Sequence, residues 1–402
     1  MSDAIIFEHV RTPRGRGRPD GALHAVTPLS LAAQTLAELR RRAGFAPAEI
    51  ADTGLGIVMP VGEQGCDLTR FALLEAGWGE GAAGYQLNRF CTSGLDTVRI
   101  AGALVASGQA EAAVGGGVES MSRVPIGSDG GAAYSDPALL ARFPYVPNGL
   151  AADLMASLDG TTRAEADSYA AESQARAAAA RAEGRFARAL FPVRGPGGEV
   201  VLEEDEAIRP ATTPETLAAL PLAFEALGAL GYDDLLRDRY PGLERVEHIH
   251  TGGNSSGIVD GACAVLVGSA AWGRANGLTP RVRIRACVSL ASEPHLSLAG
   301  VVPATDAALA RAGMQIGDID LFEVNEAFAA VPLRYARHYG IDRDRINANG
   351  GAIALGHPLG ATGAMLLGTL IDELERRDLG TGLVTLCAAA GQSTAMIVER
   401  FR

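Results

Sequence analysis

Blocks of hydrophobic residues with two different periods follow one another along the first third of the chain. Apolar residues recur at three- and four-residue intervals over 29–42, the spacing of one helical face, and Gly44 ends that helix. Shorter apolar runs, such as 110–114, are typical of buried strands. The predicted elements are strands at 4–8, 54–61, 84–87 and 110–114 and helices at 29–42, 68–76 and 95–106. Because strands and helices alternate, we expect an α/β fold with a mainly parallel sheet covered on both faces.

The middle of the chain, residues 123–252, does not continue this alternation. It contains most of the long polar loops, an Ala- and Arg-rich helix at 163–182 and an acidic turn at 203–206. We interpret this region as an insertion that covers a site. From Gly253 the α/β pattern resumes.

The last third of the chain repeats the first in outline. The triplet Arg-Ala-Gly at 42–44 precedes an isoleucine and a strand, and the same triplet at 311–313 precedes another isoleucine and the strand 321–324. Two copies of one unit that face each other place corresponding loops near a shared centre. The predicted division is an N-terminal half at 1–122 completed by about 253–280, an inserted domain at 123–252, and a C-terminal half at 281–402.

A glycine-rich segment, residues 350–363, has neither a helical nor a strand pattern. It contains five glycines, a single histidine, His357, and almost no other polar side chain. Glycine weakens both helices and strands, and it lets the backbone approach other groups closely. An apolar helical pattern begins at Pro358, so we expect His357 on a tight loop at the start of a helix.

Composition and charge exclude several classes of protein. The 402 residues are 48% apolar and 20% charged, which suffices for large cores, and the net charge of -12 argues against a nucleic-acid surface. The first residues lack the apolar run of a signal peptide, and no apolar stretch reaches the ~18 residues of a membrane span. The five cysteines are odd in number, widely spaced and without a CxxC pair. We therefore expect reduced thiols, no metal site and a cytoplasmic location.

Cys91 is the first candidate for chemistry. It follows a predicted strand and opens a predicted helix, where the helix N-terminus favours the thiolate. Ser93 and Gly94 are small, so a substrate could approach the sulfur as a nucleophile requires. The alternative is a buried and inert thiol, the usual state of a free cysteine.

Three further residues are candidates for the same site. His357 is either a proton acceptor or oxyanion donor, or a structural residue that caps a loop. Cys387 ends an apolar strand and is either a second thiol for proton transfer or a core residue. Asn325 follows the strand 321–324, where it either holds a water or an oxyanion or caps the next helix. The remaining cysteines, Cys66, Cys263 and Cys287, are interpreted as structural.

Five stretches together resemble the thiolase family in motif, order and spacing, over nearly the whole chain. They are Cys-Thr-Ser-Gly at 91–94, Gly-Gly-Gly-Val-Glu-Ser-Met-Ser at 115–122, Asn-Glu-Ala-Phe at 325–328, the segment 350–363, and the segment around Cys387. The sequence is most similar to bacterial degradative thiolases. The resemblance implies two similar βαβαβ-type halves in α-β-α-β-α layers with an inserted loop domain. It also implies an acyltransferase that cleaves 3-ketoacyl-CoA to acetyl-CoA and a shortened acyl-CoA, or condenses acetyl-CoA units.

The resemblance assigns roles to the candidate residues. Cys91 is the nucleophile that becomes acylated, and His357 takes up its proton. Cys387 exchanges a proton with the α-carbon of acetyl-CoA. The enolate oxygen is expected near His357 and a water on Asn325, and the acyl oxyanion near the backbone N–H groups of Cys91 and Ala389.

The resemblance also implies the ligand and the assembly. The loop 250–261 is similar to the family's loop on the pantetheine arm, where Ser256 and Phe328 are expected to bind coenzyme A. Arg209 is expected near the nucleotide end, where a fixed cation suits a phosphorylated ligand. Coenzyme A acts as a substrate, no tightly bound cofactor or metal is implied, and a homodimer or homotetramer is expected.

Two departures from the family pattern affect the expected substrate. Ala389 and Ala390 stand where many members have glycine, and Pro147 and Asn148 align with a His-Met pair of short-chain members. These changes weaken the case for a strict acetoacetyl preference and leave room for a longer or bulkier acyl group. Two alternatives stay open: a related condensing enzyme of the ketoacyl-synthase or sterol-carrier type, and a non-catalytic homologue that binds coenzyme A.

Overall fold

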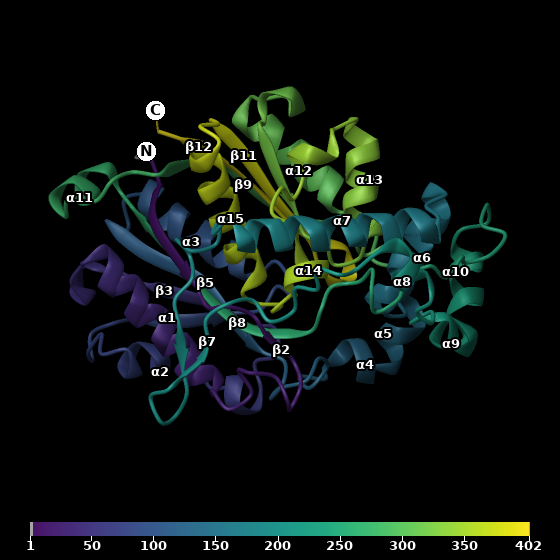
Figure 1. The fold of residues 1–402 in the computed structure, drawn as a ribbon, viewed down its shortest axis with the longest axis horizontal. Helices are drawn as coiled ribbons and strands as arrows, with labels where there is room; N and C mark the ends of the chain where they lie inside the picture. Colours follow the sequence, from purple (N-terminus) through teal and green to yellow (C-terminus); the bar gives the residue numbers. More distant parts are fainter. Residues whose placement is uncertain (1–2, 402) are drawn as a thin grey trace.

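A computed structural model describes residues 3–401 of the chain, and Figure 1 shows its fold. Its strands are β1 (Ile5–Arg11), β2 (Gly15–Arg16), β3 (Thr53–Gly56), β4 (Gly84–Leu87), β5 (Ala112–Ser120), β6 (Val193–Arg194), β7 (Val200–Leu202), β8 (Val259–Gly268), β9 (Val282–Ala291), β10 (Leu321–Val324), β11 (Thr381–Cys387) and β12 (Gln392–Arg400). A 10-stranded sheet has the order β10-β11-β12-β9-β1-β8-β5-β3-β4, with β2 paired to β8, and β6 and β7 form a separate hairpin.

The α-helices vary from single turns to twenty residues. They are α1 (Pro28–Ala43), α2 (Leu68–Glu75), α3 (Ser93–Ala106), α4 (Ala132–Ser135), α5 (Pro137–Arg142), α6 (Asn148–Asp159), α7 (Arg163–Ala182), α8 (Pro214–Ala218), α9 (Glu225–Leu227), α10 (Asp233–Arg239), α11 (Ala270–Ala275), α12 (Val301–Ala312), α13 (Ala330–Tyr339), α14 (Ala352–Leu355) and α15 (Thr362–Arg376). Within the described residues, none of the helices is long and apolar enough to cross a membrane.

Local sequence explains where the best-predicted helices begin and end. Thr27 precedes α1, and its side chain accepts a hydrogen bond from the backbone N–H of Ser30. Gly44 ends the same helix with a φ of 72°, a left-handed conformation that glycine adopts without a steric cost. A capping box at Thr162 begins α7, whose bounds match the prediction of a helix over 163–182.

The two ends of the large sheet have the same strand order and the same strand directions. In the N-terminal half, β3 is parallel to β5, and β5, β8 and β1 follow in antiparallel steps. In the C-terminal half, β10 is parallel to β11, and β11, β12 and β9 follow in antiparallel steps. The halves meet where Ile5 of β1 pairs with Arg283 of β9. The repeat seen in the sequence is therefore a repeat of topology.

Alternate residues of the strands face two different cores, which gives the layered arrangement. Leu266 of β8 packs with α1, whereas its neighbour Val265 packs with α3 and α15. Ile397 of β12 packs with α12 and α13, whereas its neighbour Met396 joins the cluster of α3 and α15. The layers are thus outer helices, half a sheet, the central pair α3 and α15, the other half of the sheet, and outer helices. This α-β-α-β-α order is the one that the thiolase resemblance implies.

The expectation of a mainly parallel sheet is wrong. Only the pairs β3–β4, β3–β5 and β10–β11 are parallel, and the other neighbours in the sheet are antiparallel. The reason lies in the connections: β11 turns directly into β12, and a short turn can join only antiparallel strands. Element boundaries also differ. β3 ends at Gly56 and not at residue 61, β1 continues to Arg11, and β5 continues through the glycines at 115–117. One helical turn, α14, interrupts the loop at 350–363.

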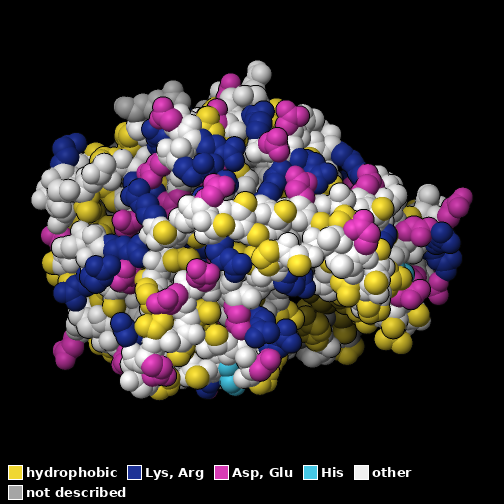
Figure 2. All heavy atoms as spheres, viewed as in Figure 1, with side chains coloured by type: hydrophobic (Ala, Val, Ile, Leu, Met, Phe, Trp, Pro, Cys, Tyr) yellow, Lys and Arg dark blue, Asp and Glu magenta, His cyan; other side chains and the backbone are white. Residues whose placement is uncertain are grey.

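Charges are mixed on the surface. On the face shown in Figure 2, basic and acidic side chains are interspersed and do not form large areas of one sign.

Two acidic side chains of the insertion make ion pairs with the N-terminal segment. Asp205 lies 2.8 Å from Arg11, and Glu206 lies 2.7 Å from Arg16. The acidic turn predicted at 203–206 therefore holds the insertion against β1 and β2.

Backbone of the two halves packs closely at Gly360. Added β-carbons on Gly56, Gly94 and Gly117 would lie 2.5, 2.5 and 2.0 Å from the carbonyl oxygen of Gly360. These three glycines belong to β3, α3 and β5 of the N-terminal half, whereas Gly360 precedes α15 of the C-terminal half. Only glycine allows this approach, because any side chain would overlap a backbone oxygen.

We expect Gly117→Ala to lower the free energy of unfolding by about 3 kcal/mol or more, because the methyl group forces the backbone of the two halves apart. The control is Gly81→Ala, since an added β-carbon at Gly81 meets no atom within 4 Å. We expect the control to change the free energy of unfolding by less than about 1 kcal/mol. Urea unfolding followed by circular dichroism measures both, and equal stabilities of the two variants would contradict the prediction.

Candidate active site

Four predicted catalytic residues lie where strands end or helices begin, on four separate segments. Cys91 lies between β4 and α3, and Asn325 directly follows β10. His357 lies between α14 and α15, and Cys387 is the last residue of β11. All four side chains are buried. Since β10 and β11 are parallel neighbours, their ends lie together, and Asn325 N donates to Thr385 O at 3.0 Å.

Direct contacts bring these four segments to one place. Nδ2 of Asn325 lies 3.5 Å from Nε2 of His357. Cys91 belongs to the same apolar cluster as Leu359 and Ala388, which are close neighbours of His357 and Cys387 in the sequence. The structure therefore gathers the motifs that the sequence carries far apart.

The protonation of His357 follows from its hydrogen bonds. Thr362 donates its hydroxyl proton to Pro358 O at 3.0 Å, so the Thr362 oxygen accepts from Nδ1–H of His357 at 2.6 Å. Nε2 of the neutral ring then carries a lone pair. Burial, and then the positive charge of Arg14, lower the pKa of His357 to about 3. His357 is thus a neutral base whose Nε2 can accept a proton.

Cys91 lies in a tight turn and is a neutral thiol. Phe90 has a φ of 49°, which is uncommon for a bulky residue, and its backbone N–H donates to Asn88 Oδ1 at 2.9 Å. Burial, and then the charge of Glu119, raise the pKa of Cys91 to about 12. Burial therefore opposes the thiolate that the helix N-terminus favours. α3 begins two residues after Cys91, and burial outweighs the helix dipole.

Cys387 is also held as a neutral thiol. Burial raises its pKa well above the usual value, and the nearby Cys91 raises the pKa of Cys387 further. A thiol that keeps its proton can deliver it to a carbanion or an enolate, and its thiolate can take a proton back. The described structure shows all five cysteines as free thiols.

A buried carboxylate, Glu119 of β5, joins the loops around the site. Its oxygens accept from the backbone N–H groups of Val58, Met59 and Gly360 at 2.9, 3.1 and 2.9 Å, and from Nε2 of Gln64 at 2.8 Å. Burial raises the pKa of Glu119, while these donors favour its charged form. Glu119 therefore positions both the loop after β3 and the loop that carries His357.

A second buried carboxylate, Glu326, joins the insertion to the site. Tyr169 and Ser173 of α7 donate to Glu326 at 2.9 and 2.7 Å, and the backbone N–H of Ile353 donates at 3.1 Å. In Figure 1, α7 runs across the front of the molecule beside α14. The inserted region therefore fixes the end of β10, with Asn325, as well as the start of the His357 segment.

A cavity of about 280 Å³ opens beside Cys91. At ~30 Å³ for each water in the liquid, this is the volume of about nine water molecules. It is far larger than an acetyl group requires. The lining residues are Val58, Met59, Asn88, Phe90, Cys91, Ile126, Asp129, Gly130, Ala132, Ala133, Tyr134, Tyr145, Asn148, Leu359, Ala389 and Ala390.

The residues expected to bind coenzyme A lie outside this cavity lining. Ser256 N donates to Ala327 O at 3.0 Å, and the carbonyl of the next residue accepts from His357 N at 2.8 Å. The ring of Phe328 packs edge-on against His250, with centroids 5.4 Å apart. The loop 250–261 therefore contacts the segments of His357 and Asn325 without lining the cavity.

Arg209 is exposed, and its guanidinium makes no hydrogen bond or ion pair with any other residue between 3 and 401. Its backbone N–H donates to Oε1 of Gln174 at 2.7 Å, which anchors the loop to α7. A cation that is anchored through its backbone and free at its head can bind a phosphate. The structure does not bring Arg209 into contact with the four catalytic candidates.

The two departures from the family pattern both fall on the cavity. Ala389 and Ala390 line it, and Ala390 has a φ of 56°, which glycine adopts more easily than alanine. Asn148 also lines it and accepts a hydrogen bond from Ser297 Oγ at 3.1 Å. Ala389, Ala390 and Asn148 therefore shape the cavity beside Cys91.

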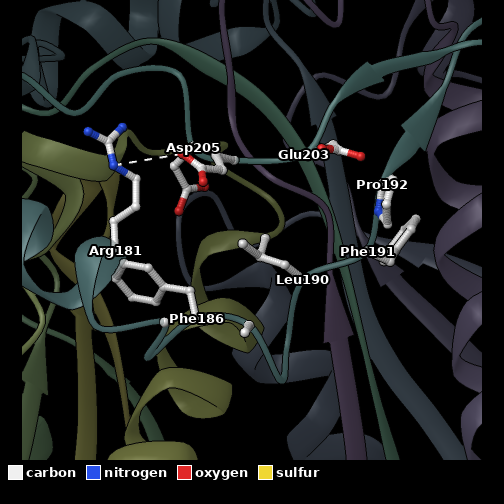
Figure 3. Close-up of a pocket in the computed structure, with 10 residues that line it drawn as sticks. Arg181, Phe186, Leu190, Phe191, Pro192, Glu203 and Asp205 are labelled. Carbon is white, nitrogen blue, oxygen red and sulfur yellow. Dashed lines mark ion pairs between the residues drawn. The ribbon is translucent and has the colours of Figure 1, made fainter.

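A second cavity, of about 260 Å³, contains none of the predicted site residues. Figure 3 shows Arg181 and Phe186 on one side of it and Phe191 and Pro192 on the other. Three of its four charged residues are already paired, since Arg181 lies 3.8 Å from Glu204 and Asp205 pairs with Arg11. We therefore assign it no part in the candidate site.

The sequence did not reveal the residues that set the state and the shape of the site. Thr362 determines which nitrogen of His357 carries the proton, and Glu119 positions two loops. Asp129 and Tyr145 line the cavity. Glu119 lies within a motif that the sequence did single out, so its place in a buried strand after three glycines was an available signal. Thr362 and the two cavity residues carry no such local signal.

Comparisons with known proteins agree with this geometry. Residues 4–231 match the family model described as "Thiolase, N-terminal domain", and residues 278–400 match "Thiolase, C-terminal domain". A 3-ketoacyl-CoA thiolase of Colwellia psychrerythraea is 38% identical, with 100% of each chain covered. A 3-ketoacyl-CoA thiolase of Aeromonas salmonicida is also 38% identical over 100% of each chain. So is the Escherichia coli 3-oxoadipyl-CoA/3-oxo-5,6-dehydrosuberyl-CoA thiolase, again over 100% of each chain.

The two family models together span most of the described residues, and the motifs that carry the resemblance meet at one buried site. The chain therefore belongs to the thiolase family.

Proposed function

We propose that this thiolase cleaves 3-ketoacyl-CoA with coenzyme A, through an acyl group on Cys91, and accepts acyl groups longer than acetyl. The chain is an acyltransferase, and the reverse condensation of acyl-CoA units uses the same groups. The observation that carries the proposal is the cavity of about 280 Å³ beside Cys91, which the His357–Asn325 pair and the loop 250–261 do not line.

The first half of the reaction transfers the acyl group to the enzyme. Cys91 Sγ attacks the 3-keto carbon, and its proton passes to Nε2 of His357, which carries a lone pair. The C2–C3 bond then breaks, and its electron pair stays with C2 as the enolate of acetyl-CoA. Cys387 protonates C2, so acetyl-CoA leaves, an acyl thioester remains on Cys91, and Cys387 is a thiolate.

The second half of the reaction returns both protons. The thiol of a new coenzyme A gives its proton to the Cys387 thiolate and attacks the acyl carbonyl. Cys91 leaves as a thiolate and recovers its proton from the imidazolium of His357. The product is the shortened acyl-CoA, and every side chain ends in its starting state.

Stabilisation of the enolate is the demanding step. After His357 accepts a proton, Nε2–H becomes a donor aimed at the position beside Asn325. Oδ1 of Asn325 is buried and has no partner within residues 3–401, so it can accept from a water that holds the enolate oxygen. The backbone N–H groups of Cys91 and Ala389 are the proposed donors to the acyl oxyanion.

We further propose that Ser256 and Phe328 contact the pantetheine arm and that Arg209 contacts the phosphorylated end of coenzyme A. The exposed, unpaired guanidinium of Arg209 supports this role. A homodimer or homotetramer in the cytoplasm, with roles in fatty-acid degradation, is the assembly and setting that the family suggests. We also keep the division of the chain at 1–122, 123–252 and 281–402 as a proposal. The ketoacyl-synthase-like and non-catalytic alternatives are not favoured by the family matches.

We expect wild-type protein mixed with 3-ketoacyl-CoA, without free coenzyme A, to gain the mass of one acyl group, and Cys91→Ala to gain none. Cys66→Ala is the control, because Cys66 is an exposed thiol outside the cavity lining, and it should gain the acyl mass normally. Intact-protein mass spectrometry over several chain lengths gives the result. An adduct that persists on Cys91→Ala would reject Cys91 as the nucleophile.

We expect Cys91 to react with iodoacetamide faster as pH rises, by about tenfold per unit between pH 7 and 10, because only the thiolate reacts. The sign follows from the pKa of Cys91 at about 12: the reactive fraction is small and still increasing throughout this range. Peptide mass spectrometry measures the rate at Cys91. A rate that is already constant from pH 7 would show a resting thiolate–imidazolium pair instead.

We expect Thr362→Val to lower kcat by about 10- to 100-fold, because Nδ1–H of His357 loses a hydrogen bond worth ~1–3 kcal/mol and the ring loses its fixed tautomer. Thr362→Ser restores the hydroxyl and should recover most of the rate. Thr369→Val is the matched control on the same helix, since Thr369 donates only to Met365 O at 3.0 Å. Steady-state thiolysis gives kcat and KM, and a change confined to KM would argue against the positioning role.

A further inference from the structure

The cavity beside Cys91 has a charge that bears on which acyl groups it accepts. Among its described lining residues, the charged side chain is Asp129, and no Arg, Lys or His lines it. Asp129 is half-buried and makes no hydrogen bond or ion pair with any other residue between 3 and 401. The cavity therefore holds an unneutralised negative charge.

The other polar side chains of the cavity carry no charge. Asn88 donates to Val58 O at 3.0 Å and accepts from Phe90 N, and Asn148 accepts from Ser297. The rings of Tyr134 and Tyr145 pack edge-on, with centroids 5.2 Å apart. Asp129 is therefore the charged side chain that an acyl group in the cavity encounters.

The two arginines nearest to Asp129 in the sequence make no ion pair with it in the described structure. Arg123 is bound to Glu63 at 2.5 Å, and its other guanidinium nitrogen donates to His24 O. Arg142 lies over the ring of Phe143, with its guanidinium carbon 5.7 Å from the centroid. Neither arginine belongs to the cavity lining.

In the proposed function, the acyl chain and not coenzyme A occupies this cavity. The loop 250–261 and Arg209, which are the proposed contacts of coenzyme A, lie outside the lining, whereas Cys91 and Ala389 are part of it. An acyl chain on Cys91 that enters the cavity therefore shares it with Asp129.

We propose that Asp129 is a specificity-determining residue that makes the cavity select acyl chains with an uncharged end and reject chains that end in a carboxylate. This rests on the proposed function. A terminal carboxylate would face Asp129 at short range in a partly dehydrated space, where like charges repel strongly and no cation compensates. An uncharged chain meets mainly apolar side chains such as Met59, Ile126 and Leu359.

The proposed selectivity differs from the substrates in the names of some relatives. The Escherichia coli relatives named 3-oxoadipyl-CoA/3-oxo-5,6-dehydrosuberyl-CoA thiolase and beta-ketoadipyl-CoA thiolase carry names of substrates with a terminal carboxylate. The relatives named 3-ketoacyl-CoA thiolase are equally similar overall. Identity over the whole chain does not decide between these substrates. The proposal therefore rests on the charge of Asp129 in the acyl cavity of this chain.

The test compares 3-oxohexanoyl-CoA, 3-oxoadipyl-CoA and the methyl ester of 3-oxoadipyl-CoA, which have the same acyl backbone. The ester keeps the polar end without its charge, so it separates charge from size. For wild type we expect kcat/KM with 3-oxoadipyl-CoA to be about 100-fold below that with the ester. For Asp129→Asn we expect this ratio to fall to about tenfold or less.

Glu80→Gln is the control for net charge, because Glu80 is an exposed carboxylate outside the cavity lining, and it should keep the wild-type ratio. Wild type that uses 3-oxoadipyl-CoA as well as its ester would overturn the inference and leave the proposed function intact. An unchanged ratio in Asp129→Asn would likewise overturn it. Failure to turn over any of the three substrates would instead overturn the proposed function, and the inference with it.

Discussion

The site depends on a contact between backbone atoms of the two halves of the molecule. A β-carbon on Gly56, Gly94 or Gly117 would overlap the carbonyl oxygen of Gly360. Because Gly360 is three residues from His357 and Gly94 is three residues from Cys91, this contact joins the segment of the base to the segment of the nucleophile. Glu119 reinforces it by accepting from Gly360 N and from the loop after β3. A duplicated α/β unit thus becomes one active site because glycine lets its halves touch.

Burial decides the electrostatics of the site more than any pair of charges. It holds both thiols and the imidazole in their neutral forms, so the resting site carries little charge for water to solvate. Proton transfer from Cys91 to His357 then creates charge only when a substrate is present to share it. The buried carboxylates Glu119 and Glu326 are compatible with this environment because several N–H and O–H groups donate to each of them.

The insertion does more than cover the site. Through Tyr169 and Ser173 it fixes the segment of Asn325, and through its acidic turn it holds Arg11 at the end of β1. Its earlier part also supplies Asp129 and Tyr145 to the acyl cavity. The same region therefore contributes to the stability of the catalytic segments and to the choice of acyl group, while the duplicated core carries the chemistry.

Sequence alone determined the alternation of helices and strands, the repeat, and the motifs that carry Cys91, Asn325, His357 and Cys387, because these are written in neighbouring residues and their periods. It misjudged the directions of the strands, and it did not reveal the burial of Cys91 or Thr362 as the partner of His357. Those properties depend on tertiary contacts, such as the hydrogen bond between Glu119 and Gly360, which are 241 positions apart. Burial, which sets the pKa values, and the cavity that places Asp129 before Cys91 arise only when distant segments pack, so only the tertiary structure decided them.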